Sequence, residues 1–334
     1  MCRSVPVAVS VRAKWPGAEI DWLVQDSFAA AVEAHPAVSR VVRFPRSEVR
    51  VGDWWMGRAR RRLWSFLGSL RERRYDLVLD CQGLGRSGVF AWWTGAGRRV
   101  GFSSARELGW LGYTERHDAA ASMHTVDRML RLIELAGIEP VRDMRLYTTE
   151  ESRGRAAELA GEGGFIVVAP TSRWAGKRWP AERFVEVMEG LRREAPGVRA
   201  VIVGAEHERE QIGVLLERSA AWGGWAIDAV GRTPVGVLMA LIERSRLVIA
   251  NDSAALHMAV GFDRALIGLF GPTNVSLVGP YGRERDVIQE MHPGERNRHK
   301  NEAWGRAAME AISSRRVLEA ALERLAEPGG SFKR

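Results

Sequence analysis

The sequence of 334 residues has little cysteine and no long apolar run. Cys2 and Cys81 are its only cysteines, which argues against a disulfide framework or a cysteine metal cluster and fits a reducing compartment. No apolar run approaches the roughly 20 residues that cross a bilayer as a helix. The segment after Met1 lacks the apolar stretch of a secretory signal peptide. These absences predict a cytoplasmic globular protein.

Metal-binding patterns and net negative charge are also missing. The seven histidines show no metal-ligand spacing, so we expect no metal and no cofactor. Arginine supplies most of the formal net charge of +8, which favours an anionic partner. That partner could be nucleic acid, an acidic membrane surface or a phosphorylated small molecule. A genome rich in G and C would give the same composition.

The length and the pattern of the first half predict an α/β domain at residues 1–148. A chain this long exceeds one ordinary core, so we expect two domains. Strand-like apolar runs alternate with helical segments, at residues 20–24, 27–34, 41–42, 54–74, 77–79 and 123–136. Such alternation is typical of a parallel sheet with helices on both faces.

The second half repeats this pattern, and we assign it to a domain at residues 149–315. Strand-like and helical segments again alternate, at residues 165–168, 181–193, 200–203, 206–218, 235–244, 247–250 and 265–270. A terminal segment at residues 316–334 carries a last helix, which we expect to pack back on the first domain. The overall prediction is two doubly wound, Rossmann-like domains that face a cleft.

The two predicted domains begin differently. Residues 7–13 predict a helix that leads into residues 15–17, and the first strand-like run comes only afterwards. A doubly wound domain normally begins with a central strand and a loop before its first helix. We therefore expect that the first strand of the N-terminal domain is missing from this sequence.

A polar turn follows the buried strand predicted at residues 247–250. This Asp252 turn, residues 251–257, opens a short helix, and the next apolar run ends in a tight turn at residues 271–273. Asp252 and Ser253 can cap the helix, while its free amides can face an anion. Open α/β sheets hold their ligands at the carboxyl ends of parallel strands. The sequence therefore predicts a phosphate-and-sugar site here.

A second polar loop, residues 169–180, follows the strand predicted at residues 165–168. Thr171, Ser172 and Lys177 lie in this loop with two arginines, and Pro180 opens the next helix. Hydroxyls and cations are the groups that bind a diphosphate. The alternative is a solvated basic loop whose tryptophans pack on the domain. The matching position of the Asp252 turn favours the binding site.

Two further residues near these loops have competing interpretations. Glu208 follows a third strand end, where a carboxylate could hold sugar hydroxyls, but it could equally complement the dipole of the helix that it begins. For Glu208 taken by itself we favour the dipole. His257 can face the same side of its helix as Asp252. Its position favours a role in bracing the loop or facing the ligand over that of an ordinary core histidine.

In the first half, arginines cluster on the predicted helix at residues 54–74. Arg58, Arg60, Arg61 and Arg62 lie there beside interleaved tryptophans. They form either a solvated helix face or a surface for an anionic acceptor. The tryptophans suit nucleic-acid stacking and an amphipathic face on the domain or a membrane equally well. Gln82 lies at a strand end and points to the same crevice as the phosphate site.

Five short motifs occur in order along the chain: WPGAEIDWLV at residues 15–24, DCQGLGRS at 80–87, TS…KRWP at 171–180, DSAALH at 252–257 and FGPT at 270–273. Together they resemble the motifs of the glycosyltransferase family 9 heptosyltransferases, over about residues 5–282. The resemblance implies a GT-B fold. It also implies inverting transfer of heptose from ADP-heptose to the inner core of lipopolysaccharide.

The resemblance also implies roles for individual residues. Lys177 would neutralise charge on the leaving ADP, which needs no metal. The other implied donor-binding residues are Thr171, Ser172, Glu208, Asp252, Ser253, Ala254 and His257. The implied acceptor-binding residues, which would meet acidic Kdo and phosphate groups, are Arg58, Arg60, Arg61, Arg62 and Gln82.

The sequence departs from the family pattern at two places. Ala254 stands where the family usually has glycine, so the backbone approaches phosphate less closely. The family's general base is an aspartate in the loop after the first strand, and that segment precedes the residue matching Val5. Either the chain start is mis-set or this form is catalytically impaired. We favour the first because the donor motifs are intact.

Three hypotheses follow. The primary one is a cytoplasmic heptosyltransferase that acts at the inner face of the inner membrane, where we expect it to be a peripheral protein. The second is a catalytically impaired protein of the same fold that only binds a nucleotide sugar. The third, a nucleic-acid binder, is disfavoured because the basic residues form no known nucleic-acid motif.

Overall fold

The computed structural model describes residues 1–46, 48, 57–290 and 302–327. Contacts divide the chain into two compact units, which we call unit 1 (Arg3–Asp143) and unit 2 (Met144–Arg334). The division falls a few residues before the boundary expected near Thr148. No helix in the described part of the chain has both the length and the apolar character to cross a membrane.

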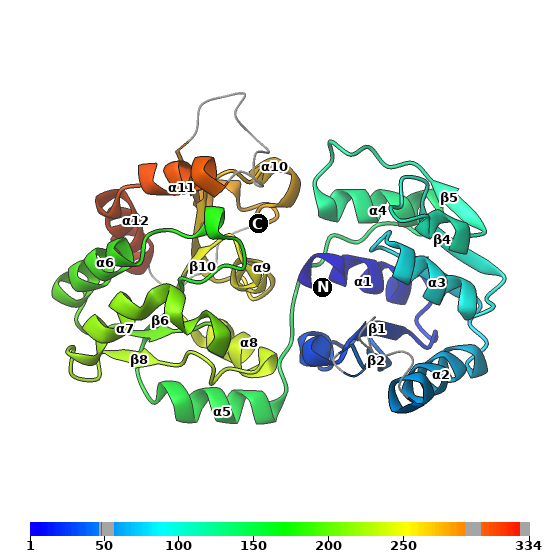
Figure 1. Cartoon of the computed structure of the whole chain (residues 1–334), viewed down its shortest axis with the longest axis horizontal. Coiled ribbons are helices and arrows are strands. Elements are labelled where there is room, and N and C mark those ends of the chain that lie inside the picture. Colours follow the sequence, from blue (N-terminus) through cyan, green and yellow to red (C-terminus); the bar gives the residue numbers. More distant parts are fainter. Residues whose placement is uncertain (47, 49–56, 291–301, 328–334) are drawn as a thin grey trace. The chain divides into compact units, whose positions relative to one another are not determined.

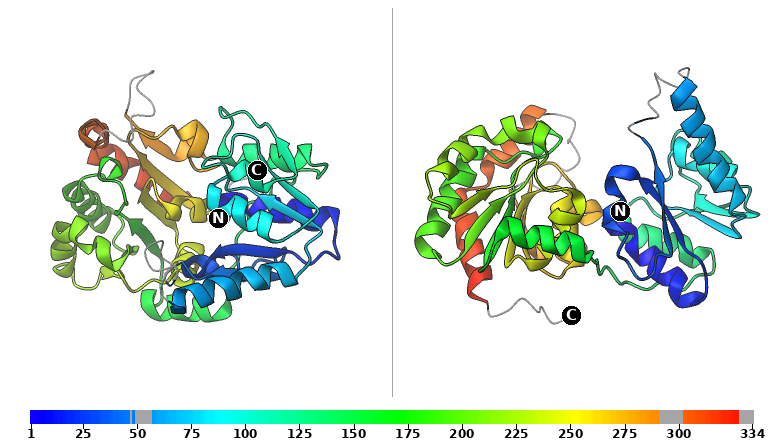
Figure 2. Two further views of the ribbon diagram at one scale, coloured as in Figure 1. Left: turned by 45° about the vertical axis from the view of Figure 1, so that its right-hand side comes forward. Right: turned by 90° about the horizontal axis from the view of Figure 1, so that it is seen from below.

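Unit 2 is built around a six-stranded parallel sheet (Figures 1 and 2). Its strands are β6 (Phe165–Ala169), β7 (Arg199–Ile202), β8 (Ala226–Asp228), β9 (Leu247–Asn251), β10 (Ala265–Phe270) and β11 (Val287–Gln289). They lie in the order β11-β10-β9-β6-β7-β8. In this order the first strand, β6, is central, and the chain reverses its direction of winding between β6 and β9, as in a doubly wound dinucleotide-binding fold.

Helices cover both faces of this sheet (Figure 2). The helices described in unit 2 are α5 (Glu150–Ala160), η4 (Ala175–Lys177), α6 (Ala181–Glu194), η5 (Glu206–Ile212), α7 (Gly213–Ala220), α8 (Val235–Arg244), α9 (Ala254–Gly261), α10 (Val275–Val278), η6 (Glu284–Asp286), α11 (Glu302–Ala311) and α12 (Ser314–Ala326). Strands β6, β9 and β10 are buried along their whole length. Burial on both faces explains why their sequences are almost entirely apolar.

The terminal helix α12 belongs to unit 2. Val317, Ala321 and Leu325, spaced four residues apart, are buried in the core of unit 2. The helix packs against α6, β9 and β10 of that unit. Arg324 also donates to the buried carboxylate of Asp286 at 2.9 Å. This apolar stripe packs into the core of unit 2, and α12 therefore forms part of unit 2.

The single helix expected at residues 206–218 is different. The structure has the 3-10 helix η5 followed by α7, which begins at Gly213. The Glu208 carboxylate accepts a hydrogen bond from the backbone N–H of Ala205 at 3.1 Å, which fixes a tight first turn. The segment is thus held by a local side-chain contact that helical periodicity does not reveal.

The described part of unit 1 contains two separate parallel sheets. One pairs β1 (Asp21–Gln25) with β2 (Arg40–Phe44), and the other has the order β3-β4-β5, with β3 (Leu77–Asp80), β4 (Arg98–Phe102) and β5 (Glu115–His117). Its helices are η1 (Cys2–Ser4), α1 (Val5–Lys14), η2 (Asp26–Ala31), α2 (Gly57–Glu72), α3 (Gly85–Trp93), η3 (Gly109–Gly112) and α4 (Thr125–Leu135). Among the described residues, no strand is hydrogen-bonded to both β1 and β3.

Side chains connect the parts of unit 1 that strands do not. The rings of Phe44 on β2, Phe66 on α2 and Phe90 on α3 form a triad with centroid distances of 5.1 to 5.2 Å. The hydroxyl of Tyr75, just before β3, donates to the Asp21 carboxylate at the start of β1 at 2.7 Å. Helix packing and polar side chains therefore supply contacts that a shared strand supplies in unit 2.

Candidate functional site

The predicted phosphate site lies at the carboxyl ends of β6 and β9. These strands are hydrogen-bonded neighbours, with Ala169 paired to Ala250 at the last position of the register. The two polar loops that follow them therefore leave the sheet side by side. This is the switch point of the strand order, where open α/β sheets bind their ligands.

An ion pair connects the two loops. The Lys177 ammonium donates to the Asp252 carboxylate with an Nζ–Oδ2 distance of 2.6 Å, and the two side chains are only 19% and 11% exposed. The hydroxyl of Thr273, after β10, donates to the same oxygen at 2.7 Å. The predicted proximity of Lys177 and the Asp252 turn is confirmed, and Thr273 adds a third strand end to the cluster.

A buried amide holds the two loops in register. Asn251 is fully buried; its Nδ2 donates to the Pro170 carbonyl at 2.6 Å and its Oδ1 accepts from the Trp179 backbone N–H at 3.3 Å. Both ends of the 169–180 loop are thereby tied to the end of β9. The sequence interpretation gave Asn251 no role of its own. A polar residue that ends a fully apolar strand was the available signal.

The hydroxyl residues of the first loop face η5. Thr171 and Ser172 are buried, and the Thr171 hydroxyl donates to the Glu208 carboxylate at 2.8 Å. The backbone N–H of Ser172 donates to Gln211 Oε1 at 3.3 Å. Glu208 therefore caps the start of η5 and also contacts the loop of the predicted site.

A buried hydroxyl without a partner lies at the start of α9. Ser253 is the N-cap residue, but its side chain makes no capping hydrogen bond. Its Oγ is shielded from solvent and has no hydrogen-bond partner, although buried polar atoms are normally paired. Ala254, the next residue, is exposed at the helix N-terminus, and His257 lies half-buried one turn further on. The arrangement suits an anion that would accept from Ser253 Oγ and the free amides.

Helix α11 braces the loop that carries Lys177. Gly305 of this helix lies so close to Gly176 that a Cβ on Gly305 would come within 2.6 Å of the Gly176 carbonyl oxygen. The Trp179 indole N–H donates to the Ile312 carbonyl at 3.0 Å. The sequence interpretation missed both glycines, because this contact joins residues far apart in the chain.

The predicted acceptor residues belong to unit 1. Arg58, Arg60, Arg61 and Arg62 are exposed in the first turns of α2. Gln82 is exposed just after β3, in a turn held by hydrogen bonds from the Gln82 and Gly83 backbone N–H groups to the Asp80 carboxylate at 2.9 and 3.1 Å. Along the chain, α2 follows β2, and Gln82 follows the carboxyl end of β3.

A buried hydrogen bond fixes that turn. The Tyr113 hydroxyl donates to the second oxygen of the Asp80 carboxylate at 2.6 Å. Burial, followed by the charge of Asp80, raises the pKa of Tyr113 well above its usual range, so the hydroxyl stays protonated and keeps donating. The Asp80 carboxylate is thus held by Tyr113 while it accepts the two backbone hydrogen bonds that stabilise the Gln82 turn.

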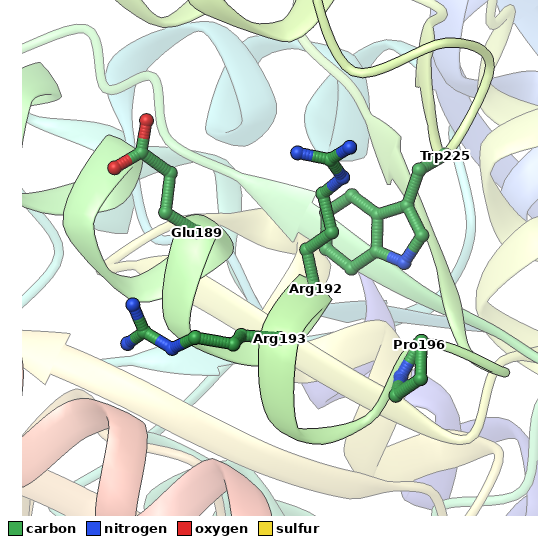
Figure 3. Close-up of a pocket in the computed structure, with 5 residues that line it drawn as sticks. All are labelled: Glu189, Arg192, Arg193, Pro196 and Trp225. Atoms are coloured by element: carbon green, nitrogen blue, oxygen red, sulfur yellow. The ribbon is translucent and has the colours of Figure 1, made fainter.

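A shallow surface pocket in unit 2 lies away from this site. It is lined by Glu189, Arg192, Arg193, Pro196 and Trp225 (Figure 3). Pro196 precedes β7 and Trp225 precedes β8, so the pocket is at the amino edge of the sheet. The polar cluster at the opposite, carboxyl edge is the stronger candidate because its side chains converge.

Comparison with known proteins agrees with this geometry. The family model described as "Glycosyltransferase family 9 (heptosyltransferase)" matches residues 63–307. The chain belongs to glycosyltransferase family 9. This confirms the family resemblance that the five motifs indicated.

Relatives of the family 9 chain cover most of its length. Lipopolysaccharide heptosyltransferase 1 of Pseudomonas aeruginosa is 29% identical over 297 residues, covering 84% of this chain and 78% of that protein. Lipopolysaccharide heptosyltransferase 2 of Salmonella typhimurium is 24% identical over 336 residues, covering 96% and 93%.

Solved structures show the same fold. The structure of the Escherichia coli heptosyltransferase WaaC with ADP superposes with a TM-score of 0.77 at 23% identity, covering 97% of this chain and 95% of that one. A family 9 glycosyltransferase from Veillonella parvula gives 0.78 at 21% identity, covering 98% and 93%. The family 9 chain thus has the α/β fold of heptosyltransferases of the GT-B class.

Proposed function

We propose that this chain is an inverting glycosyltransferase that moves heptose from ADP-heptose to the inner core of lipopolysaccharide. The observation that carries the proposal is the cluster of Lys177, Asp252 and Thr273 beside the unpaired Ser253 hydroxyl. Together these groups offer a cation, a carboxylate and free donors at one switch point. A sugar diphosphate presents the complementary groups, because it combines anionic oxygens with hydroxyls.

In the proposed donor complex, each polar group has one task. Lys177 neutralises charge on the leaving diphosphate, an electrostatic role that is strongest in a site shielded from water. Asp252 accepts from heptose hydroxyls, and Ser253 and Ala254 offer donors to phosphate at the start of α9. The methyl group of Ala254 limits how closely the backbone can approach.

The remaining donor residues act around that centre. Thr171 and Ser172 bind the diphosphate from the β6 side. Glu208 contacts the nucleoside. Its hydrogen bonds to Thr171 and to the start of η5 place its carboxylate beside the loop that binds the diphosphate. His257 supports the Asp252 turn from α9. The chemistry is proposed to be independent of metal.

The proposed acceptor residues are in unit 1. Arg58, Arg60, Arg61 and Arg62 meet the acidic Kdo and phosphate groups, since arginine binds such oxygens through a planar fork. Gln82 adds an amide at the carboxyl end of β3. The protein acts in the cytoplasm, in peripheral contact with the inner membrane. We assign the general base to no residue of this chain.

Truncation of Lys177 tests the proposal. Lys177→Ala removes the charge that stabilises the leaving group, and loss of one such donor costs about 10²–10³ in kcat. Transfer from ADP-heptose and calorimetric ADP binding are measured in parallel. The matched control is Lys14→Ala, which removes an exposed lysine of unit 1. A folded wild-type protein that binds neither ADP nor an ADP-sugar would refute the proposal.

A second candidate function is binding of a nucleotide sugar without transfer. The observation that favours it is that β1-β2 and β3-β4-β5 are separate sheets in the described part of unit 1, whereas the polar cluster of unit 2 is assembled on one continuous sheet. ADP-heptose binding with no transfer to a lipopolysaccharide core acceptor would support this function. Transfer at any rate that depends on Lys177 would exclude it.

A further inference from the structure

Large apolar side chains are exposed on one side of unit 1. Trp64 on α2 is 55% exposed, and Val89 and Trp92 on α3 are 53% and 57% exposed. Leu108 and Leu111, at η3, are exposed as well. The proposed donor and acceptor residues include none of these five. Exposed apolar side chains are ordinary singly, but a contiguous group marks an interaction surface.

Ring contacts show that the group is contiguous. The Trp93 ring lies 5.5 Å from Trp64 and 5.9 Å from Trp92, measured between centroids. The Trp93 indole N–H donates to the Leu67 carbonyl of α2 at 3.0 Å, which fixes α3 beside α2. Val89 precedes these two tryptophans by one helical turn, so it lies on the same outer side of α3.

The 3-10 helix η3 extends this surface on the other side of α3. A Cβ on Gly88 would come within 2.2 Å of the Gly109 carbonyl oxygen, so α3 and η3 are in backbone contact. Leu108 and Leu111 project from η3 into solvent. We call the surface formed by Trp64, Val89, Trp92, Leu108 and Leu111 the tryptophan face.

Positive charge flanks the tryptophan face along α2. Arg60 precedes Trp64 by four residues and Arg71 follows it by seven, so all three lie along one side of the helix. Both arginines are exposed, and neither pairs with an acidic residue in the described part of the chain. Glu72 is the only acidic residue of α2, at its last position.

We propose that the tryptophan face docks on an anionic phospholipid bilayer. Tryptophan is favoured at the boundary between headgroups and acyl chains, where leucine and valine insert and arginine meets acidic headgroups. Nucleic acid fits less well, because bases stack on free aromatic faces. Both tryptophans of the tryptophan face pack on Trp93, and its other three side chains are aliphatic. The inference rests on the proposed function only in that its acceptor is a membrane lipid.

Vesicle co-sedimentation of the full chain tests the inference. Vesicles of phosphatidylcholine alone are compared with vesicles of equal parts phosphatidylcholine and phosphatidylglycerol. We expect binding to the anionic vesicles, loss of that binding in the double variant Trp64→Ser/Trp92→Ser, and about fivefold weaker binding in Arg71→Glu. Added salt should weaken the arginine contribution and leave the apolar one.

Two control variants change the same residue types elsewhere. Trp174→Ser removes a tryptophan of unit 2 that is 54% exposed, and Arg192→Glu reverses an exposed charge on α6; both should bind vesicles like the wild type. The inference is overturned if the wild type does not bind anionic vesicles or if the double variant binds them equally well. Binding of a single-stranded oligonucleotide that requires Trp64 and Trp92, without vesicle binding, would overturn it in favour of nucleic acid. ADP binding, measured on every variant, reports separately on the proposed function.

Discussion

The two units use the same kind of sheet and complete it differently. In unit 2, β6 is hydrogen-bonded to β7 on one side and β9 on the other, with β10 and β11 beyond. In the described part of unit 1, β1-β2 and β3-β4-β5 are separate sheets. Unit 2 is therefore ordered around its central strand, whereas unit 1 depends on helices and side chains to hold its sheets together.

The central strand of unit 2 supports the site as well as the core. In unit 2 the loop after β6 carries Thr171, Ser172 and Lys177, and its neighbour β9 presents Asp252. The strand thus positions the site as well as the core. In unit 1 the corresponding connections are the Phe66 triad and the Tyr75–Asp21 hydrogen bond. These contacts hold the sheets of unit 1 together through side chains rather than through a shared strand.

The largest effect is expected from truncating the aromatic core of each unit. Phe66→Ala removes a buried ring from between Phe44 and Phe90, and such truncations cost about 3–5 kcal/mol. Because the triad connects β2 with α2 and α3, unit 1 should unfold at lower urea concentration. ADP binding by the folded protein should be unchanged. Urea unfolding, with and without ADP, measures both.

The matched variant in unit 2 is Phe184→Ala. Phe184 is buried, and its ring centroid lies 4.8 Å from that of Trp179. Trp179 belongs to the same loop as Lys177 and is tied to the end of β9 through Asn251. This change should cost a similar amount and also weaken ADP binding. Loss of ADP binding in Phe66→Ala would contradict the assignment of the ADP site to unit 2. Full retention of ADP binding in Phe184→Ala would contradict the link from Phe184 through Trp179 to the Lys177 loop.

A smaller effect is expected at the polar contact between the sheets of unit 1. Tyr75→Phe removes the donor to Asp21, whose carboxylate keeps its bond from Arg40, so the cost should be about 1 kcal/mol. Burial, and next the hydrogen bond to Asp21, raises the pKa of Tyr75 from 10.0 to about 12.

The pH dependence of this contribution has a definite sign. The folded protein binds the phenol proton more tightly than the unfolded chain, so the contribution is complete below pH 10 and is lost as the pH rises toward 12. Unfolding of wild type and Tyr75→Phe is compared across this range. A difference in stability that grows with pH would contradict the assignment.

The smallest effect concerns reactivity rather than stability. Desolvation, with the charge of Asp80 next, raises the pKa of the Cys81 thiol to about 12, so little thiolate forms near pH 8. A disulfide reagent should react slowly with Cys81 in the folded protein and fully after denaturation. The Cys81→Ser variant identifies the signal. Rapid reaction in the native state would show that the carboxyl end of β3 is less closely packed than the end of β6.

The sequence predicted the strongly patterned elements well. The strand expected at residues 265–270 is β10, and the helix expected at 235–244 is α8. The apolar run of β10 fits a fully buried strand, and the helical spacing of apolar residues in α8 fits a helix with one buried face. The predicted helix at residues 54–74 is described from Gly57 to Glu72, while residues 54–56 are outside the described part.

The sequence failed where a distant contact decides the local structure. The place of α12 follows from the fit of Val317 and Ala321 to the core of unit 2. The cap that Glu208 makes on the backbone N–H of Ala205 is local, but helical periodicity does not reveal it. Asn251, Gly176 and Gly305 had no assigned role because their partners lie far along the chain. In each case the local pattern allows several structures with similar free energy, and packing selects one.

By itself, the sequence determined the parallel α/β class, the loops that carry polar groups, and the family. Apolar periodicity and short motifs are local properties, so they can be read without knowing which elements are neighbours. The tertiary structure adds that Lys177 and Thr273 both donate to Asp252, that Ser253 Oγ is left unpaired, and that Trp64 and Trp92 share one exposed surface. These are relations between distant segments, fixed by strand order and close packing, which no single stretch of sequence contains.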